Sequence, residues 1–487
     1  MNLNTTLKKF IKKHKNNKNQ VIFHSSSCKN NTAIENIINN FLTKKNSFIF
    51  ESVEKRKIRG RYTILGADPD KIWEFNKNKI YLIQNKKKTI IKKPPYEYLK
   101  NLIEGFNFVL PKNLPPICSL LVGYFSYDVI RYIEKIPDNC KDDLKIPDIR
   151  ILRPKTIIIH DNLLKKIYFI NNCFSDEKIK NYEKYFIKQK ENIEYLKKIT
   201  FNKIYKKPLI KKYNNKIKVK SNISKNKFKS IVLKAKKYIK NGDIFQVVLS
   251  QRFETKLTKR PIEIYKKLRI NNPSPFMYFF NFEDFQIIGS SPEILVRLRK
   301  NKITIRPIAG TRPRGSNNKK DLFFKKQLLN DKKELSEHLM LLDLGRNDVG
   351  KVSKVNSVKV TERFKIEKYS HVMHIVSNVE GSFNNKISLL DTMFAGFPAG
   401  TVTGAPKIRA MEIIDELEKN KRKMYAGSIG YFSANKSFDT CIALRTALIK
   451  KNKFYIQAGA GIVADSIPEK EYAETVNKAK ALISSLV

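Results

Sequence analysis

The spacing of apolar residues in the first half of the chain predicts short strands and hairpins. Residues 47–53 form a candidate strand, and residues 79–93 form a candidate hairpin. A clearer hairpin spans residues 156–170, where Asp161-Asn162 supplies the turn. From about residue 175 to residue 222 Lys, Asn, Glu and Tyr replace the apolar runs, which indicates a solvated helix followed by a linker.

Helical spacing is clearer in the second half. Ser224 is placed to cap a helix whose apolar residues recur every three or four positions, and Asn241-Gly242 is placed to end it. Further helices are predicted over residues 331–345, 404–417 and 468–486, and strands over 243–253, 277–291, 293–308 and 425–463. Segregated helices and hairpins predict an α+β fold with large, mostly antiparallel β-sheets flanked by helices. We expect an N-terminal domain over 1–175, a Lys/Asn-rich helix and linker over 176–223, and a C-terminal domain over 224–487, which becomes the predicted catalytic domain once its motifs are considered below.

The charge of the chain suggests one possible function. Lys and Arg number 97 and Asp and Glu 45 among 487 residues, a formal charge of +52. Such an excess is compatible with a nucleic-acid-binding protein. The basic residues are mostly Lys, spread along the chain with many Asn and Ile, as an A/T-rich coding sequence alone would produce. The 41% apolar content excludes a fully disordered chain.

Apolar runs and cysteine spacing indicate the cellular compartment and whether structural zinc is expected. No apolar run reaches the length of a membrane helix, and the first residues lack the apolar segment of a signal peptide. The five cysteines are scattered without a CxxC pair, so we expect neither a disulfide framework nor structural zinc. A reduced, cytoplasmic location is the simplest expectation, with no partnership with membrane or nucleic acid.

Four carboxylates are candidates for metal binding. Glu334 and Glu337 are three residues apart on one predicted helix, and Glu471 and Glu474 are three apart on another, so each pair shares a helix face. Two such faces turned toward each other would form an oxygen-rich pocket suited to Mg²⁺. Lys478 follows one turn after Glu474. A solvated helix face would show the same spacing, so the sequence alone leaves both readings open.

Other candidate residues are equally open. Gly-rich turns at 308–315, 399–407 and 457–463 would let backbone amides approach an anion, although most such turns are structural. Arg445 lies in a predicted apolar strand, where it would bind a substrate carboxylate or form an ion pair. His374 lies on another predicted strand, where it would act either as a catalyst or as a structural residue.

Taken together, the motifs resemble one family. SSPEILV, PIAGTRPRG, ELSEHLMLLDLGRNDVG, AGTVTGAPKIRAMEII, YAGSIGYF, DTCIALR, QAGAGIVADS and EYAETVNKA occur in the order seen in chorismate-utilising enzymes. FIFES, GRYTILG and GYFSYDVIRYIE are similar to the N-terminal domain of the anthranilate synthase component I branch. The resemblance spans nearly the whole chain and implies an anthranilate-synthase-like fold.

The resemblance also implies roles. Glu337 and Glu474 match Mg²⁺ ligands, with Glu334 and Glu471 in support, and the metal would hold the ring carboxylate of chorismate. Glu293 matches the acid that assists loss of the C4 hydroxyl, His374 the residue linked to pyruvate elimination, and Thr401 an active-site hydroxyl. The matched substrate-contacting positions are Gly310, Thr311, Tyr425, Arg445, Gly459, Ala460, Gly461 and Lys478.

Two positions select among branches of the family. The para-aminobenzoate branch typically carries an attacking Lys where this chain has Ala309, and isochorismate and salicylate synthases a water-activating Lys where it has Gln246. Ammonia is therefore the expected nucleophile, which points to an Mg²⁺-dependent lyase that forms anthranilate. Aminodeoxychorismate synthase component I is the nearest alternative, and a degenerate, inactive scaffold is disfavoured because the matched residues are present.

Two partners are implied. No amidotransferase nucleophile motif surrounds any cysteine, so a separate glutamine amidotransferase subunit is expected to supply ammonia, in a heterotetramer of two copies of each subunit. FIFES matches the element that binds tryptophan as a feedback inhibitor, with Ser52 as the contact; Pro275, Phe276 and Met277 match the other wall. A core strand edge and a hairpin would explain the same two segments.

Overall fold

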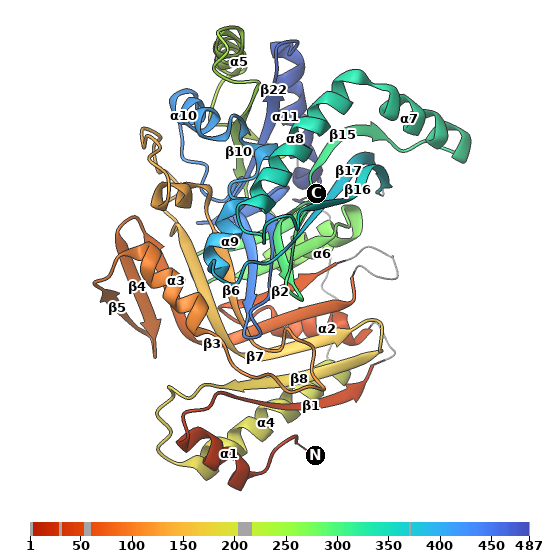
Figure 1. Ribbon diagram of the computed structural model, residues 1–487. Helices are drawn as coiled ribbons and strands as arrows, with labels where there is room; N and C mark the ends of the chain where they lie inside the picture. The colour runs from red at the N-terminus through yellow and green to blue at the C-terminus, as the bar shows by residue number, and fades with distance from the viewer. Residues whose placement is uncertain (1–2, 29–31, 53–59, 203–216, 370–371, 487) are drawn as a thin grey trace.

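The computed structural model describes residues 3–28, 32–52, 60–202, 217–369 and 372–486. Two long strands, β3 (Tyr62–Asn76) and β7 (Ile149–Asp161), pair along most of their length and organise the molecule. One end of each strand continues into one sheet arm, and the other end into a second arm. The result is an extensive antiparallel β structure with helices around it (Figure 1).

The first arm begins at the N-terminus and ends at the residues of greatest chemical interest. Every pairing along it is antiparallel. Its strand order is β1 (Gln20–Ser27), β8 (Lys166–Cys173), β7, β3, β2 (Ser47–Glu51), β11 (Phe276–Asn281), β12 (Gln286–Ser291), β21 (Thr446–Lys450), β22 (Lys453–Ile462) and β10 (Gln246–Lys256). Short strands β9 (Lys220–Ser221) and β18 (Gly404–Ala405) extend β10.

The second arm runs through the other ends of β3 and β7 and is antiparallel as well. Its order is β5 (Lys87–Ile91), β4 (Lys79–Gln84), β3, β7, β6 (Leu120–Phe125), β19 (Ser428–Ser433), β20 (Phe438–Ile442), β13 (Ile294–Arg299), β14 (Lys302–Ile305) and β17 (Val372–Ser382). Strands β15 (Ile308–Pro313) and β16 (Lys359–Lys368) also pair with β17.

The two arms enclose an aromatic core. Tyr124 of β6, Tyr278 and Phe280 of β11, and Phe48 of β2 are fully buried and belong to one cluster. Alternation along these strands explains the arrangement, since every second side chain faces the opposite arm. Gly289 leaves room for Tyr278, because a Cβ there would lie 2.2 Å from the tyrosine ring. This core holds the N-terminal and C-terminal halves of the chain together.

Helices cover the outer surfaces (Figure 1). Those that share a core cluster with the first arm are α1 (Leu7–Lys15), α2 (Thr32–Phe41), α4 (Tyr182–Phe201), α6 (Pro261–Asn271) and α11 (Pro468–Ile483), which continues into η3 (Ser484–Leu486). A second cluster includes α3 (Pro95–Gly105), η1 (Tyr127–Tyr132), α5 (Lys225–Lys240), α9 (Leu389–Ala395), η2 (Gly400–Val402) and α10 (Lys407–Leu417). Helix α7 (Asn318–Asn330) and the long α8 (Lys332–Gly350) lie beside β15 and β17.

Most elements expected from the sequence are present. Ser224 accepts a hydrogen bond from the backbone of Lys227 and caps α5, and Gly242 ends that helix with a φ of 81°. The predicted α+β architecture with large antiparallel sheets is therefore confirmed. Strand pairs β2–β11 and β6–β19 connect the predicted N-terminal and catalytic domains, whose boundaries remain a prediction.

Two expectations need correction. Arg445 does not lie in a strand: it occupies the break between β20 and β21 with a φ of 47°, a left-handed conformation that ends the pleat. Helix α4 is not solvated on all sides, because Ile193 and Leu196 are fully buried. Most of the predicted linker that follows, residues 203–216, lies outside the described residues. Within the described ranges no helix is long and apolar enough to cross a membrane.

Candidate active site

Carboxylates from α8 and α11 approach each other. Burial raises the pKa of Glu337 on α8, and the negative charges of Glu334 and Glu474 raise it further, which places a side chain of α11 within electrostatic reach. Burial likewise raises the pKa of Glu471, with Glu474 adding to the effect. The two i, i+3 pairs predicted from the sequence therefore share one site.

The N-terminus of α8 is fixed by several polar contacts. Asp331 caps the helix by accepting from the backbone of Lys333 and Glu334. Arg312 of β15 pairs with Asp331 at 2.7 Å and with Glu334 at 2.9 Å. These contacts hold Glu334 beside β15, with its carboxylate only partly neutralised by one guanidinium.

One turn later, His338 anchors the same helix in the core. Its Nε2 lies 2.7 Å from the hydroxyl of Ser377 on β17, and burial lowers its pKa to about 4. A neutral imidazole at this point adds no charge to the site. Neighbouring Glu337 is half-buried, on the part of the helix that meets Gln246.

Glycines on β22 leave space beside these carboxylates. A Cβ at Gly459 would lie 2.5 Å from the hydroxyl of Tyr425, and one at Gly461 would lie 2.6 Å from the amide nitrogen of Gln246. Lys478 of α11 donates to the carbonyl of Gly459 at 2.9 Å and pairs with Glu474 at 2.7 Å. Only glycine permits this approach of side chains to the strand backbone.

Gln246 links the two faces of the site. Gln246 lies on β10, which pairs with β22, and its amide nitrogen donates to Glu337 at 3.0 Å. Its side-chain oxygen is buried and has no hydrogen-bond partner among the described residues. A buried acceptor without a partner is costly, so this oxygen faces the place where a polar ligand would fit.

A histidine and a threonine form the next part of the site. His374 of β17 lies opposite Thr311 of β15; its Nδ1 is 3.0 Å from the Thr311 hydroxyl and 3.0 Å from the Gly310 carbonyl. Burial lowers the pKa of His374 to about 4, and the nearby charges of Arg445 and Lys478 lower it further. The imidazole is therefore neutral at physiological pH.

Glu293 has the most perturbed carboxyl group of the site. It lies between β12 and β13, is 6% exposed, and accepts hydrogen bonds from the Thr401 hydroxyl at 3.2 and 3.3 Å. Burial raises its pKa to about 8, although hydrogen bonds from Thr401 and from the Ile308 backbone oppose the shift. At neutral pH the group therefore holds a proton that it can donate.

Arg445 completes the basic part of the site. Solvent reaches this side chain, yet the surrounding protein desolvates the guanidinium enough to lower its pKa. Within the described parts of the chain no carboxylate pairs with it. Its charge acts on His374, which places it near β17. An unpaired, partly enclosed guanidinium is suited to bind an anionic ligand.

Comparison with known proteins agrees with this geometry. The profile described as "chorismate binding enzyme" matches residues 45–484. The chain belongs to the family of chorismate-binding enzymes. Anthranilate synthase component 1 of Cereibacter sphaeroides is 43% identical over 486 residues, covering 98% of this chain and 96% of the relative. The protein of the same name from Aquifex aeolicus is 46% identical, covering 81% of this chain and 79% of the relative.

Solved structures give the same family. Anthranilate synthase component I from Streptococcus pneumoniae matches with a TM-score of 0.77 and 36% identity, covering 88% of this chain and 93% of that one. The menaquinone-specific isochorismate synthase of Escherichia coli matches with a TM-score of 0.74 at 19% identity, covering 99% of each chain, and so shares the fold. The anthranilate-synthase-like fold expected from the motifs is therefore confirmed.

A divalent metal fits the carboxylates of this site. After burial, the charges of Glu334 and Glu474 help raise the pKa of Glu337, and the charge of Glu474 helps raise that of Glu471; a cation between the carboxylates would reverse these effects. The carboxylates are spread over two helices, and no group of three or more His, Cys, Asp or Glu is gathered closely enough to form a complete metal cage within the described ranges. Such carboxylates suit a hard cation that keeps several waters and uses one or two carboxylates together with ligand oxygens.

The residues predicted to bind the inhibitor lie close together in space, although they come from two segments far apart in the sequence. Strand β2 pairs with β11 so that Met277 lies opposite Glu51, and Ser52 follows directly. Glu51 is buried and contacts Arg269 of α6 at 2.8 Å and the Tyr265 hydroxyl at 2.5 Å. Phe276 is half-buried beside them. The sequence had indicated both segments but not their register.

Some contributors to the site were not predicted. Arg312, in the Gly-rich segment 308–315, pairs with Glu334. Glu418 and Arg422 form a fully buried pair at 2.6 Å, and the guanidinium lies 5.4 Å from the ring of Tyr425. In the sequence, only the spacing of four residues between Glu418 and Arg422, just after a predicted helix, indicated this pair.

Ala460, which the sequence did predict, is fully buried and contributes its backbone rather than its side chain.

Proposed function

We propose that this protein is the large subunit of an anthranilate synthase, converting chorismate and ammonia to anthranilate, pyruvate and water. The observation that carries the proposal is the meeting of the α8 and α11 carboxylates with the glycine-lined end of β22. Its cationic groups, Arg445 and Lys478, suit a dianionic substrate. More than 40% identity over almost the whole chain to anthranilate synthase component 1 supports the same assignment.

Mg²⁺ would be held by Glu337 and Glu474, with Glu334 and Glu471 in support. When bound, the metal would neutralise the ring carboxylate of chorismate and stabilise charge as the ring rearranges. Arg445 would bind the other carboxylate. Backbone amides near Gly310, Gly459 and Gly461, with the hydroxyls of Thr311 and Tyr425, would fix the ring between β15 and β22.

Glu293 would act as the general acid. Ammonia adds at C2 of the ring while the C4 hydroxyl leaves, and a proton from Glu293 converts that hydroxyl to water. Thr401 holds the carboxyl in position throughout. In the second step the C2 proton is removed and the C3–O bond breaks, which makes the ring aromatic; the released enolpyruvate takes up a proton and becomes pyruvate. We infer that neutral His374 assists that step.

Two residues support ammonia as the nucleophile. Neither Ala309 nor Gln246 has a basic side chain, and the free oxygen of Gln246 is able to accept a hydrogen bond from ammonia. We infer a glutamine amidotransferase subunit as the source of that ammonia, in a heterotetramer of two copies of each subunit. A pull-down in which no amidotransferase is captured, together with no glutamine-dependent activity after one is added, would contradict this partner.

Product identity tests the function. Purified protein is incubated with chorismate, Mg²⁺ and ammonium at mildly alkaline pH, and anthranilate is followed by fluorescence and identified by chromatography. We expect anthranilate formation that EDTA abolishes. The para isomer would assign the protein to aminodeoxychorismate synthesis, and isochorismate or salicylate would overturn the interpretation of Ala309 and Gln246.

We further infer feedback inhibition by tryptophan. The support is the pairing of β2 with β11, which places Ser52 beside the segment that contains Pro275, Phe276 and Met277. An amino acid bound there would lie near buried Glu51, a carboxylate able to accept a hydrogen bond from the ammonium group of that amino acid.

The cytoplasmic location expected from the cysteines stays a prediction. All five cysteines are free.

A further inference from the structure

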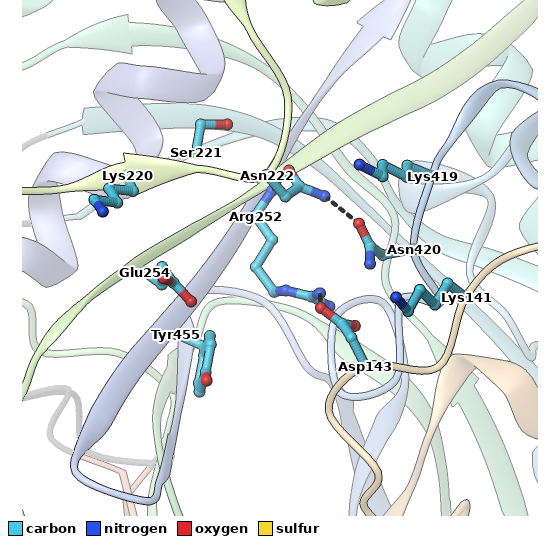
Figure 2. Close-up of a pocket in the computed structure, with 10 residues that line it drawn as sticks. All are labelled: Lys141, Asp143, Lys220, Ser221, Asn222, Arg252, Glu254, Lys419, Asn420 and Tyr455. Carbon is cyan, nitrogen blue, oxygen red and sulfur yellow. Dashed lines mark hydrogen bonds and ion pairs between the residues drawn. The ribbon is translucent and has the colours of Figure 1, made fainter.

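Figure 2 shows a cavity lined by Arg252 and Glu254 of β10 and Tyr455 of β22, toward the ends of these strands opposite to Gln246 and Gly461. Its volume is about 320 Å³, and its walls come from β9, β10, β22, the loop after α10 and an N-terminal segment near residue 141. Six residues along β10 separate Gln246 from Arg252, which is about 20 Å at the rise of a strand. The cavity is therefore distinct from the carboxylate end of the candidate active site, although Gly459 pairs with Ser250, only two residues from Arg252.

Two polar side chains in its wall are more than nine-tenths buried. Arg252 is 5% exposed, and its guanidinium pairs with Asp143 and donates to the carbonyl of Lys421 at 3.3 Å. Asn420 is 8% exposed and accepts from Asn222 at 2.9 Å. The amide nitrogen of Asn420 has no acceptor among the described residues, so it presents a free donor to the cavity (Figure 2).

The charges of the cavity do not balance. Both of its carboxylates already have partners, since Asp143 pairs with Arg252 and Glu254 pairs with Lys453 at 3.3 Å. In the described part of the chain, the ammonium groups of Lys141, Lys220 and Lys419 have no carboxylate partner, although all three line the same space. A net positive charge remains around a buried amide donor.

We propose that this cavity is a binding site for a small polyanion, a molecule with at least two phosphate or carboxylate groups. The volume is at the lower end of that of small-molecule sites, which suits a compact metabolite rather than a peptide or nucleic acid. The three lysines supply the charge, while Arg252 and Asn420 supply the rigid, buried wall that scattered surface lysines lack. Such a ligand would contact the same two strands that carry Gly459, Gly461 and Gln246.

Calorimetric titration tests the site without involving catalysis. Full-length protein, free of Mg²⁺ and chorismate, is titrated with inorganic pyrophosphate and, separately, with citrate. The test variant is K141Q/K220Q/K419Q, in which all three substitutions are at exposed positions. The matched control, K178Q/K190Q/K234Q, removes the same charge from exposed positions on and near α4 and α5.

We expect one anion per chain, bound about tenfold or more weakly by the test variant and within about twofold of normal by the control. Stronger binding of pyrophosphate than of citrate would assign the ligand to organic phosphates, and the reverse to polycarboxylates. Absence of saturable binding of either anion, or equal weakening in both variants, would overturn the proposal. Product identity in the enzymatic assay has no bearing on this result.

Discussion

Burial of Glu293 raises the pKa of its carboxyl group, which suits it to donate a proton. Because its folded pKa is raised to about 8, the carboxyl is protonated below that pH and loses its proton as pH rises through it. We expect kcat, measured at a fixed concentration of free ammonia, to fall above about pH 8. The variant Glu293→Gln should lose about 10²–10⁴-fold in kcat and also lose this limb of the profile.

Thr401→Val is the control for that assignment. The Thr401 hydroxyl stabilises the charged carboxylate and so lowers the pKa of Glu293. Its removal should move the alkaline limb to higher pH. A limb that stays in place in both variants would show that another group controls the rate.

Glu337 should control metal affinity. Burial and neighbouring carboxylates raise its pKa, so protons compete with a cation for the site as the pH falls. We expect Glu337→Gln to raise the Mg²⁺ concentration for half-maximal activity by about 10–100-fold. Asp343→Asn, at an exposed position of the same helix, should leave it unchanged. Equal Mg²⁺ dependence in the two variants would remove Glu337 from the metal site.

Strand β22 leaves space in the site because its glycines have no side chains. A methyl group at Gly459 would lie 2.5 Å from the Tyr425 hydroxyl and 3.0 Å from the Leu249 carbonyl. We expect Gly459→Ala to raise the KM for chorismate by about tenfold or more, since the side chain would occupy ligand space. Gly105→Ala, where no atom lies within 4 Å of the added methyl, should behave as wild type. Normal KM in both would place chorismate elsewhere.

The pairing of β2 with β11 carries the prediction about regulation. Ser52→Phe places a large ring at the end of β2, beside Phe276 and Met277, and should abolish inhibition by tryptophan while kcat changes less than about twofold. Ser382→Phe, at an exposed serine of β17, is the matched substitution. Retained inhibition in Ser52→Phe would separate this strand edge from the inhibitor site.

Local patterns predicted the elements well, and non-local pairing explains what they missed. Ser224, Gly242 and Pro468 marked helix ends because capping depends on neighbouring backbone groups. Arg445 was misplaced because a single left-handed residue leaves no trace in an apolar run. The contact of Gln246 with Glu337 spans 91 residues, and no periodicity reports such a distance. The site was therefore predicted as a set of residues and not as a geometry.

At the scale of the whole molecule, a buried ionic cluster joins the two halves of the chain. The Lys423 ammonium contacts Asp148 at 2.8 Å and Asp142 at 2.9 Å, and its backbone donates to Asp128. Lys423→Met would leave the buried Asp148 carboxylate without its charged partner and should lower the free energy of unfolding by about 3–5 kcal/mol. Lys45→Met, which breaks an exposed pair with Glu283, should cost less than about 0.5 kcal/mol in denaturant unfolding. Equal losses would show that the cluster contributes no more than surface charge.

The pairing of distant strands also has a consequence for the making of this protein on the ribosome. Strand β6, at residues 120–125, has β19 as a neighbour, at residues 428–433, so its partner is synthesised about 300 residues later. At about 5–20 residues per second, that interval lasts roughly 15–60 s. Throughout it, the nascent chain carries apolar strands with an open edge, the kind of surface that pairs with other chains. Slow translation therefore lengthens the period in which this protein depends on chaperones, before any of its chemistry exists.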